Sequence, residues 1–166
     1  MFQKVNTHEY QFNAFNEIGD NWTLISAPKG DRVNTMTASW GGLGVLWGRD
    51  VATVYIRQTR YTKEFVDGQD HFTLSLFDGY RKELALLGTK SGRDGDKIAE
   101  VGFHVEEVEG QPAFAESKAV MICKKLYQDD IPLDKIPADI VEKFYDDGDY
   151  HTMYIGEITA LYVNEG

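Results

Sequence analysis

The segment HFTLSLF, His71–Phe77, decides the fold class. Apolar and polar residues alternate along it. Phe72, Leu74 and Leu76 fall on one side, and His71, Thr73 and Ser75 fall on the other. A period of two residues is typical of a β-strand, in which successive side chains point to opposite faces of the sheet. The segment therefore predicts a protein built on strands.

Other segments extend this prediction in both directions. NWTLISA (21–27) and NTMTASW (34–40) are two expected strands joined by the turn PKGDR, and VATVYIR (51–57) is rich in β-branched residues. A strand over 51–57 puts Thr53, Tyr55 and Arg57 on one face and Ala52, Val54 and Ile56 on the other. FHVEEVEGQPAF (103–114) and SKAVMICKKLY (117–127) are expected to be consecutive antiparallel strands, with turns at Gly110 and near Ser117. HTMYIGEITALYV (151–163) is apolar on both faces, which suits burial between a barrel and a second subunit or a helix.

Short helices are expected between the strands. The segments are 9–19, 79–88 ending at Gly88, 94–102 with Asp94 or Asp96 as N-cap, and 136–145 opened by Pro137. We predict one mainly β domain with α insertions over residues 1–166, a closed or nearly closed antiparallel barrel, because closure removes exposed edges.

The charge and composition of the chain argue against several classes of partner and site. The formal net charge of −10 disfavours nucleic acid and anionic membranes as partners. The N-terminus lacks a basic region followed by an apolar core, and no apolar run approaches the ~20 residues that span a bilayer, so a cytoplasmic location is expected. The single cysteine, Cys123, lies in an apolar run and is interpreted as a buried strand residue rather than a catalytic thiol.

Basic residues are concentrated in one place. From Arg49 to Lys63 there are four basic residues and one acidic residue, a local charge of +3. Within RQTRYT (57–62), Arg57 and Arg60 with Thr59 and Thr62 supply the donors that a phosphate monoester requires. A helix opened by TKEF, with Thr62 as N-cap, would add free N–H groups. The alternative is a solvated strand end with surface ion pairs. The loop TKSGRDG offers a second set of candidate phosphate donors, Lys90, Ser91 and Arg93.

The segment NTMTASWGGLGVLWG (34–48) offers a surface for a flat ring. It has no Walker lysine, and Trp47 takes the third glycine position of a dinucleotide fingerprint. Consecutive backbone N–H groups beside the small residues Thr37, Ala38 and Ser39, with Trp40 next to them, suit a heteroaromatic ring. The alternative is a packed strand and a glycine turn that bind nothing.

The acidic stretch DDGDYH (146–151) does not have the spacing of a calcium loop, and we predict no metal site there. Its last residue, His151, opens the final strand. It is a candidate proton donor or hydrogen-bond partner beside a bound ring, although many histidines at such positions are only surface residues.

Four separated segments, NTMTASWGGLG, VATVYIRQTRYTKEF, LLGTKSGRDGDK and DYHTMYIGEI, together resemble the flavin reductase-like, FMN-binding split-barrel family, and its flavoredoxin-type branch in particular. The resemblance covers nearly the whole chain. It implies a Greek-key split β-barrel, a homodimer with flavin at the interface, and FMN as cofactor.

The resemblance also implies a distribution of roles. Thr35, Met36, Thr37, Ala38 and Ser39 would face the ring and ribityl groups, with Trp40 or Trp47 covering the ring. The phosphate would be held by the segment Arg57, Gln58, Thr59, Arg60 and Thr62, with Lys90, Ser91 and Arg93 completing the site from this or the other subunit. His151 corresponds to a histidine that lies near the flavin in many relatives and is the expected catalytic residue.

One departure bears on function. Relatives that reduce free flavin usually have a Ser/Thr-rich loop and an Asp-Pro-Pro turn after the TAS segment, where this chain has WGGLGVLWGRDV. The difference favours FMN held as a prosthetic group. We expect an FMN-dependent oxidoreductase that accepts hydride from NADH or NADPH. The alternatives are a flavoredoxin-like electron carrier that serves a redox protein partner, and a barrel that binds another phosphate-bearing ligand.

Overall fold

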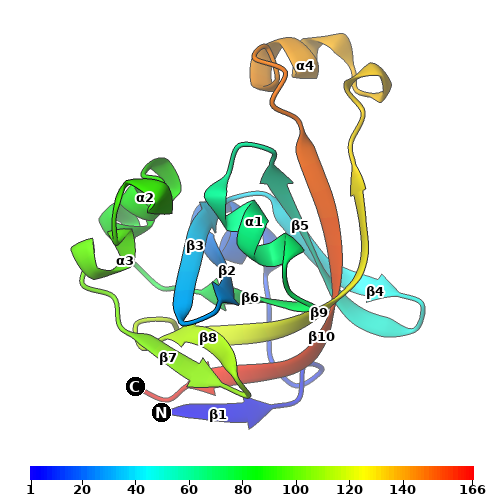
Figure 1. The fold of residues 1–166 in the computed structure, drawn as a ribbon. Coiled ribbons are helices and arrows are strands. Elements are labelled where there is room, and N and C mark those ends of the chain that lie inside the picture. The colour runs from blue at the N-terminus through cyan, green and yellow to red at the C-terminus, as the bar shows by residue number, and fades with distance from the viewer.

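An eight-stranded antiparallel sheet curls into an open barrel in the computed structural model, which describes residues 1–166 (Figure 1). Its strands are β1 (Phe2–Val5), β2 (Thr23–Lys29), β3 (Arg32–Ala38), β4 (Gly41–Leu46), β5 (Arg49–Arg57), β6 (His71–Leu76), β9 (Ala119–Asp130) and β10 (His151–Asn164). The order is β3-β2-β6-β9-β10-β5-β4, with β1 on the end of β10. Strands β3 and β4 do not pair, so the barrel is split there, and the predicted mainly β fold class is confirmed.

The core lies inside the barrel. Ala52, Val54 and Ile56 of β5 are buried there, as the alternation predicts. Phe72, Leu74 and Leu76 of β6 are buried in the same cluster. Burial of a large apolar side chain stabilises the fold by about 1.5–3 kcal/mol. This core fixes which face of β3 and β5 is left for a site.

The outer face of β6 is also covered, which the sequence pattern did not show. Thr73 and Ser75 are fully buried, because the hairpin β7 (Val105–Val108) and β8 (Gln111–Phe114) packs over β6 and β2. The predicted turn at Gly110 is present, but the expectation that the second hairpin strand continues into a pairing with the next strand was wrong. β7 and β8 pair only with each other, and β9 pairs with β6 and β10.

Strands β9 and β10 are long and bend around the barrel. Their pairing shifts register between Ile155 and Gly156 and between Ile158 and Ala160, as β-bulges do. A Cβ at Gly156 would lie 2.8 Å from the Cys123 Cβ and 2.9 Å from the Phe72 ring, so only glycine fits this crossing. Beyond the barrel the two strands carry residues 131–150 away from it as a projecting arm (Figure 1).

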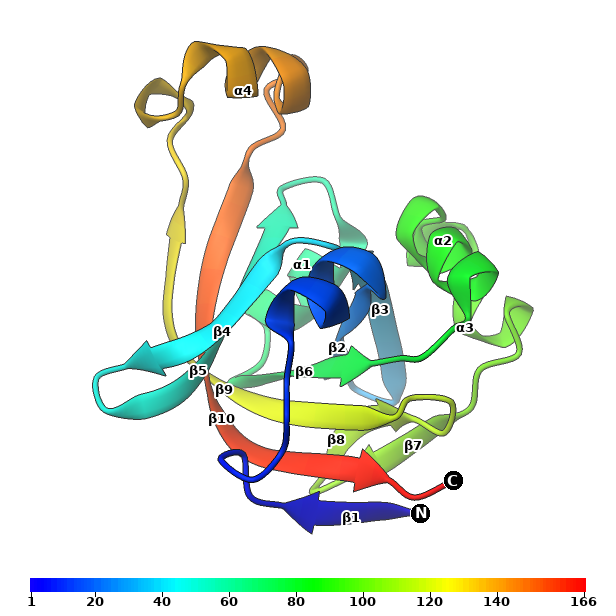
Figure 2. The ribbon, with the colours of Figure 1, turned by 180° about the vertical axis from the view of Figure 1, so that it is seen from behind.

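The helices are short and lie at the connections. They are η1 (Phe15–Asp20), α1 (Tyr61–Asp67), α2 (Arg81–Thr89), η2 (Gly92–Asp94), α3 (Lys97–Glu100), η3 (Leu133–Lys135) and α4 (Ala138–Phe144). Helices α2 and α3 lie beside β3, whereas α4 stands at the tip of the arm (Figures 1 and 2). None of the helices has the length and hydropathy needed to cross a membrane.

Four local predictions need correction. The first helix covers 15–20 rather than 9–19, because Tyr10 and Phe12 pack on the core from an irregular segment. Helix α2 runs through Gly88 to Thr89. Arg60, not Thr62, precedes the first residue of α1, and Thr62 is buried within it. The helix expected over 94–102 covers only Lys97–Glu100. In addition, Gly41–Leu46, which the alternative interpretation took as a glycine turn, is strand β4 and pairs with β5.

Candidate functional site

Two adjoining cavities lie beside strand β3, the last residues of β5 and the first residue of β10. Residues of α2 and η2 line the second of them. The ring cavity, of about 150 Å³, is lined by Met36, Thr37, Ala38, Ser39, Trp40, Tyr55, Arg57, Arg60 and His151. The cation cavity, of about 320 Å³, is lined by Asn34, Met36, Arg57, Thr59, Arg60, Tyr61, Thr62, Thr89, Lys90, Ser91, Gly92, Arg93 and Lys97. Both include Met36, Arg57 and Arg60, so they form one continuous site.

Three cations line the cation cavity without an acidic partner. Arg57, Arg60 and Lys97 take part in none of the ion pairs of the structure. Backbone carbonyls hold them instead. The Arg60 guanidinium donates to the Gly88 oxygen at 2.6 Å, and Lys97 Nζ donates to the oxygens of Leu87 and Lys90 at 2.8 Å each. The cations are thus fixed in place while their charge is left uncompensated.

The electrostatics of this cluster favour an anion. Lys97 is only 3% exposed, and its burial, with a smaller contribution from the Arg60 charge, lowers its pKa to about 8. Burial also lowers the pKa of Arg60, and the Arg57 charge acts in the same direction. A bound anion would oppose both effects, because a nearby negative charge favours the protonated form of a base.

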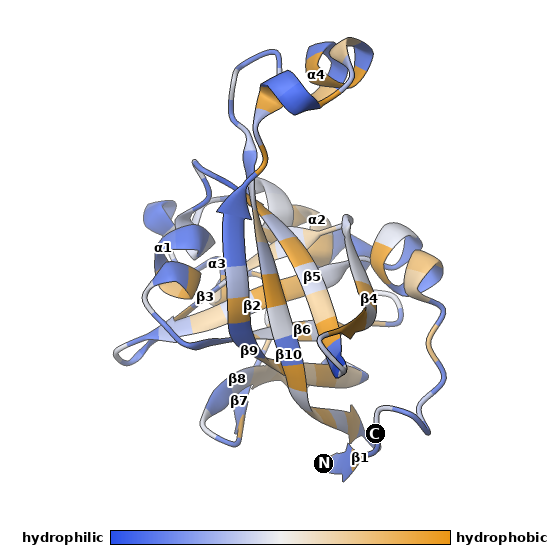
Figure 3. Cartoon of the chain, turned by 90° about the vertical axis from the view of Figure 1, so that its right-hand side faces the viewer, coloured by the Kyte–Doolittle hydropathy of each residue, from blue (hydrophilic) through white to orange (hydrophobic).

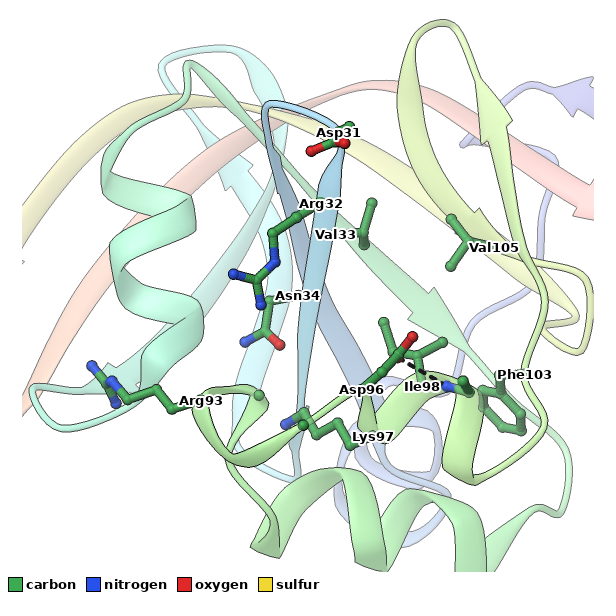
Figure 4. A pocket seen from close by; sticks show the side chains of 13 residues that line it. Asp31, Arg32, Val33, Asn34, Arg93, Asp96, Lys97, Ile98, Phe103 and Val105 are labelled. Atoms are coloured by element: carbon green, nitrogen blue, oxygen red, sulfur yellow. Dashed lines mark hydrogen bonds between the residues drawn. The ribbon is translucent and has the colours of Figure 1, made fainter.

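The floor of the cation cavity depends on a close contact between β3 and η2. Asn34 Nδ2 donates to Thr62 Oγ1 at 2.9 Å. A Cβ at Gly92 would lie 2.2 Å from Asn34 Oδ1, so a larger residue would push the loop off the strand. Figure 4 shows Asn34 and Lys97 reaching toward one another from β3 and α3, while Arg93 points away toward α1. The larger cavity drawn there, of about 540 Å³, lies on the other side of these two residues and includes the carboxylates of Asp31 and Asp96.

The ring cavity is aromatic and holds a neutral histidine. His151 is buried, and its ring centroid lies 5.3 Å from that of Trp40. His151 Nδ1 and the Tyr145 hydroxyl are 2.7 Å apart. Burial, followed by the Arg57 charge, lowers the pKa of His151 to about 4. The imidazole is therefore uncharged at neutral pH.

The projecting arm forms one wall of this site. The Arg57 guanidinium donates to the oxygens of Asp149 (2.7 Å) and Phe144 (2.9 Å) and lies over the Tyr145 ring. Thr59 Oγ1 donates to Asp149 Oδ2 at 2.6 Å. Residues far apart in the sequence thus meet at the end of β5, and the arm positions Arg57.

Most of the expected site residues come together. Met36, Thr37, Ala38, Ser39, Trp40, Arg57, Arg60 and His151 line the ring cavity, and Thr59, Thr62, Lys90, Ser91 and Arg93 line the cation cavity with the two arginines. Their assignment to a cofactor stays a prediction. Lys90 and Arg93 are paired with Glu100 and Glu64, so they contribute less free charge than Arg60.

Thr35 and Gln58 do not line either cavity. The Thr35 hydroxyl donates to the Ile25 oxygen of the neighbouring strand β2 at 3.1 Å and is fully buried. Gln58 Nε2 donates to Thr152 Oγ1 at 2.7 Å. Neither side chain faces the site.

The sequence reasoning missed Asn34, Tyr55, Lys97 and Tyr145. Asn34 and Tyr55 share strand faces with Met36 and Arg57, so the alternation could have found them. Lys97 and Tyr145 had no such signal, since each reaches the site only through the packing of α3 or the arm. No group of three or more His, Cys, Asp or Glu side chains is placed to hold a metal ion.

The structure is an antiparallel barrel, split between its two edge strands, that carries the ring cavity beside the cation cavity. Residues 15–166 match the family described as flavin reductase like domain. The chain belongs to this family. No protein of curated function matches the chain significantly by sequence.

Solved structures share the fold at low sequence identity. An FMN-binding domain of a flavin reductases-like enzyme from Shewanella baltica is 20% identical with a TM-score of 0.70, covering 98% of this chain and 77% of that one. Flavoredoxin from Methanosarcina acetivorans is 20% identical with a TM-score of 0.69, and the match covers 98% of this chain and 75% of that one. Flavoredoxin of Desulfovibrio vulgaris (Miyazaki F) is 22% identical with a TM-score of 0.69, and the match covers 99% of this chain and 78% of that one. The likeness confirms the fold expected from the sequence.

Proposed function

We propose that this protein is an FMN-binding flavoprotein that acts as an NADH- or NADPH-dependent oxidoreductase. The observation that carries the proposal is the group of three cations, Arg57, Arg60 and Lys97, that have no carboxylate partner and adjoin an aromatic cavity. Buried charges are costly unless they are paired, so a site of this kind calls for an anionic ligand. Family membership and the FMN-binding solved structures support FMN as that ligand.

The residues present fit FMN. Arg60, Lys97 and Arg57, with the hydroxyl of Thr62 and the amide of Asn34 nearby, would hold the phosphate, which carries about two negative charges near neutral pH. Met36, Ala38 and Ser39, together with Trp40 and Tyr55, would flank the ring. When bound, flavin supplies hydride and single-electron chemistry that no side chain of this chain provides.

The protein would orient this ligand and fix protons around it. The Tyr145 hydroxyl, hydrogen-bonded to His151 Nδ1, would help to determine which imidazole nitrogen carries the proton. In the tautomer in which Tyr145 donates, Nε2–H is left as a donor toward the cavity. Trp40 and Phe144 pack edge to face with centroids 5.2 Å apart at the side of the ring cavity.

One observation favours an electron carrier as the second candidate. Trp40 of the ring cavity packs against Phe144 of the arm, and these two aromatic side chains would cover one side of a bound flavin ring. A flavoredoxin-like carrier would pass electrons to a protein and would not turn over a pyridine nucleotide.

Two measurements test these proposals. Isothermal titration of the apoprotein with FMN and with riboflavin, which lacks the phosphate, should show much tighter binding of FMN. Equal affinities would contradict the phosphate assignment. The loaded protein is then mixed with NADH or NADPH without oxygen. Bleaching of the flavin absorbance supports the oxidoreductase, whereas bands that persist until a chemical reductant is added support the carrier.

A further inference from the structure

A third cavity adjoins the ring cavity on the side of helix α2. This Trp22 cavity, of about 210 Å³, is lined by Trp22, Thr37, Ser39, Leu84, Ala85, Gly88 and Thr89. It lies between α2 and the end of β3, which are side by side in Figures 1 and 2. Thr37 and Ser39 line both this cavity and the ring cavity. A molecule in the Trp22 cavity would therefore lie next to a ring held in the ring cavity.

The lining of the Trp22 cavity favours an uncharged ligand. It contains no acidic, basic or histidine side chain, unlike the cation cavity. Two of its hydroxyl groups are already used, because Thr37 donates to the Leu84 oxygen and Thr89 donates to the Ala85 oxygen at 3.0 Å. The Ser39 hydroxyl has no partner within the protein and is free to donate to a ligand. Apolar walls with one free donor suit a ring that carries a carbonyl oxygen.

The indole of Trp22 is a fixed wall of this cavity. Trp22 has a φ of 69°, which is uncommon for a bulky residue and marks a position where tertiary contacts hold the backbone. Its side chain packs against the buried cluster that includes Leu84 and Leu87. The guanidinium carbon of Arg81 lies 3.3 Å from the indole centroid. A rigid aromatic side chain at the wall suits the packing of a second flat ring.

The size and chemistry of the cavity narrow the ligand further. Cavities that hold drug-sized molecules measure about 300–1,000 Å³, so 210 Å³ suits a molecule of one or two rings. The absence of a titratable side chain means that no general acid is held beside a carbonyl group there. An aldehyde or ketone needs such an acid as it is reduced. A quinone does not, because its ring spreads the added charge over both oxygens until water protonates them.

We propose that the Trp22 cavity binds a small uncharged quinone, which is the electron acceptor of this protein. The inference rests on the proposed function, because the bound flavin would supply the electrons. Over a complete cycle NADH or NADPH loses a hydride, and the quinone gains that electron pair and hydrogen together with one proton from water and leaves as the hydroquinone. Ala85 and Thr89 are exposed, so the quinone can enter and leave past α2 while the flavin stays bound.

NMR of the tryptophan indole N–H groups tests binding without any electron transfer. The chain has three tryptophans, and Trp22→Phe and Trp40→Phe assign the two signals that matter. Menadione, a two-ring quinone, is added to the oxidised protein with and without FMN. The Trp22 signal should shift to saturation in both cases, and the Trp40 signal of the FMN-loaded protein should stay in place.

Two results of this titration would overturn the proposal. One is a Trp22 signal that menadione does not move. The other is a shift that disappears when FMN is added, because the cavity would then be part of the flavin site. A protein that binds no FMN refutes the proposed function instead, and its Trp22 signal still reports whether menadione binds.

A substitution at Ala85 tests the cavity itself. Ala85→Leu extends an apolar side chain into the cavity and keeps a strong helix former in α2. It should weaken menadione binding by about tenfold and change FMN affinity less than about twofold. Ala138→Leu is the matched control, since Ala138 is exposed and begins α4, which stands at the tip of the arm, clear of the barrel (Figure 3). Equal losses of menadione binding in the two variants would contradict the assignment.

Reoxidation of the flavin tests the acceptor role. FMN-loaded protein is reduced photochemically without oxygen and mixed with menadione or with ferricyanide, an anion that the uncharged cavity does not favour. The rate with menadione should saturate in the wild type and fall by about tenfold at low menadione in Ala85→Leu. The rate with ferricyanide should be the same for both proteins. A menadione rate that does not saturate, or that Ala85→Leu leaves unchanged, overturns the proposal.

Discussion

The cation cavity and the ring cavity adjoin, yet the structure builds them in opposite ways. The cation cavity belongs to the body of the protein, where carbonyl groups of α2 and its following loop hold Arg60 and Lys97. The ring cavity takes one wall from the arm, whose Phe144 and Tyr145 contact Trp40 and His151. The first cavity is lined by fixed cations, whereas the second adds aromatic faces and a neutral histidine to the two arginines that both cavities share.

This difference assigns a separate task to each cavity. Uncompensated buried charge supplies affinity for an anion, because binding relieves repulsion that the empty site bears. A neutral histidine and aromatic faces add little charge but control orientation and proton position. Changes in the cation cavity should therefore alter how tightly FMN binds, and changes in the ring cavity should alter what the bound cofactor does.

The largest effect is expected from removing a cation. Arg60→Gln and Lys97→Met should each weaken FMN binding about 10- to 100-fold, because a hydrogen bond to a charged group contributes about 1.5–3 kcal/mol. Riboflavin affinity should change less than about twofold. Isothermal titration measures both.

The control for this comparison is Arg93→Gln. Arg93 lines the same cavity but is exposed and paired with Glu64, and exposed pairs contribute about 0–1 kcal/mol. If Arg93→Gln weakened FMN binding as much as Arg60→Gln, it would contradict the distinction between cations with and without a carboxylate partner.

A smaller effect should appear with pH. Since the pKa of Lys97 is about 8, it loses its proton as the pH rises past that value, and FMN affinity should then fall by up to about tenfold per pH unit. The phosphate is already a dianion above about pH 6, so its own charge does not change there. Titrations at pH 7, 8 and 9 should show this slope for wild type and a flat profile for Lys97→Met.

The same lysine should influence the stability of the apoprotein in the opposite direction. Its folded pKa of about 8 lies below the value near 10.4 of an unfolded lysine, so the unfolded chain binds more protons between these values. The free energy of unfolding should therefore rise with pH from about 8 to 10, by at most about 1.4 kcal/mol per unit. Urea denaturation at pH 8, 9 and 10 measures it, and a Lys97→Met variant with the same slope would assign the effect to another group.

The smallest effect on affinity is expected in the ring cavity. Tyr145→Phe removes the hydroxyl bonded to His151, which should lower stability by about 1 kcal/mol and change FMN affinity less than about twofold. Nitrogen NMR of His151 in the apoprotein should show an altered tautomer balance. An unchanged balance would mean that Tyr145 does not set the position of the proton.

Local patterns in the sequence determined the barrel strands and much of the site. The alternation over 71–77 and 51–57 predicted strands and the core-facing residues, since period-two burial is a property of the strand itself. The concentration of basic residues from Arg49 to Lys63 predicted an anion site, and two of them, Arg57 and Arg60, line the cation cavity. The sequence was less informative about β4, because glycine-rich segments have weak strand propensity and form a strand only when a neighbour pairs with them.

Only the tertiary structure decided which side chains reach the site. Thr35 and Gln58 belong to the right segments, but their side chains are hydrogen-bonded to the Ile25 oxygen and to Thr152 instead of facing the site. Lys97 ends the quoted segment LLGTKSGRDGDK and Tyr145 lies shortly before DYHTMYIGEI, but nothing in either segment indicated that these side chains reach the site. Their positions follow from the packing of α3 near α2 and from the contacts that Arg57 makes with the arm. Such long-range packing depends on the whole fold, so no local pattern records it.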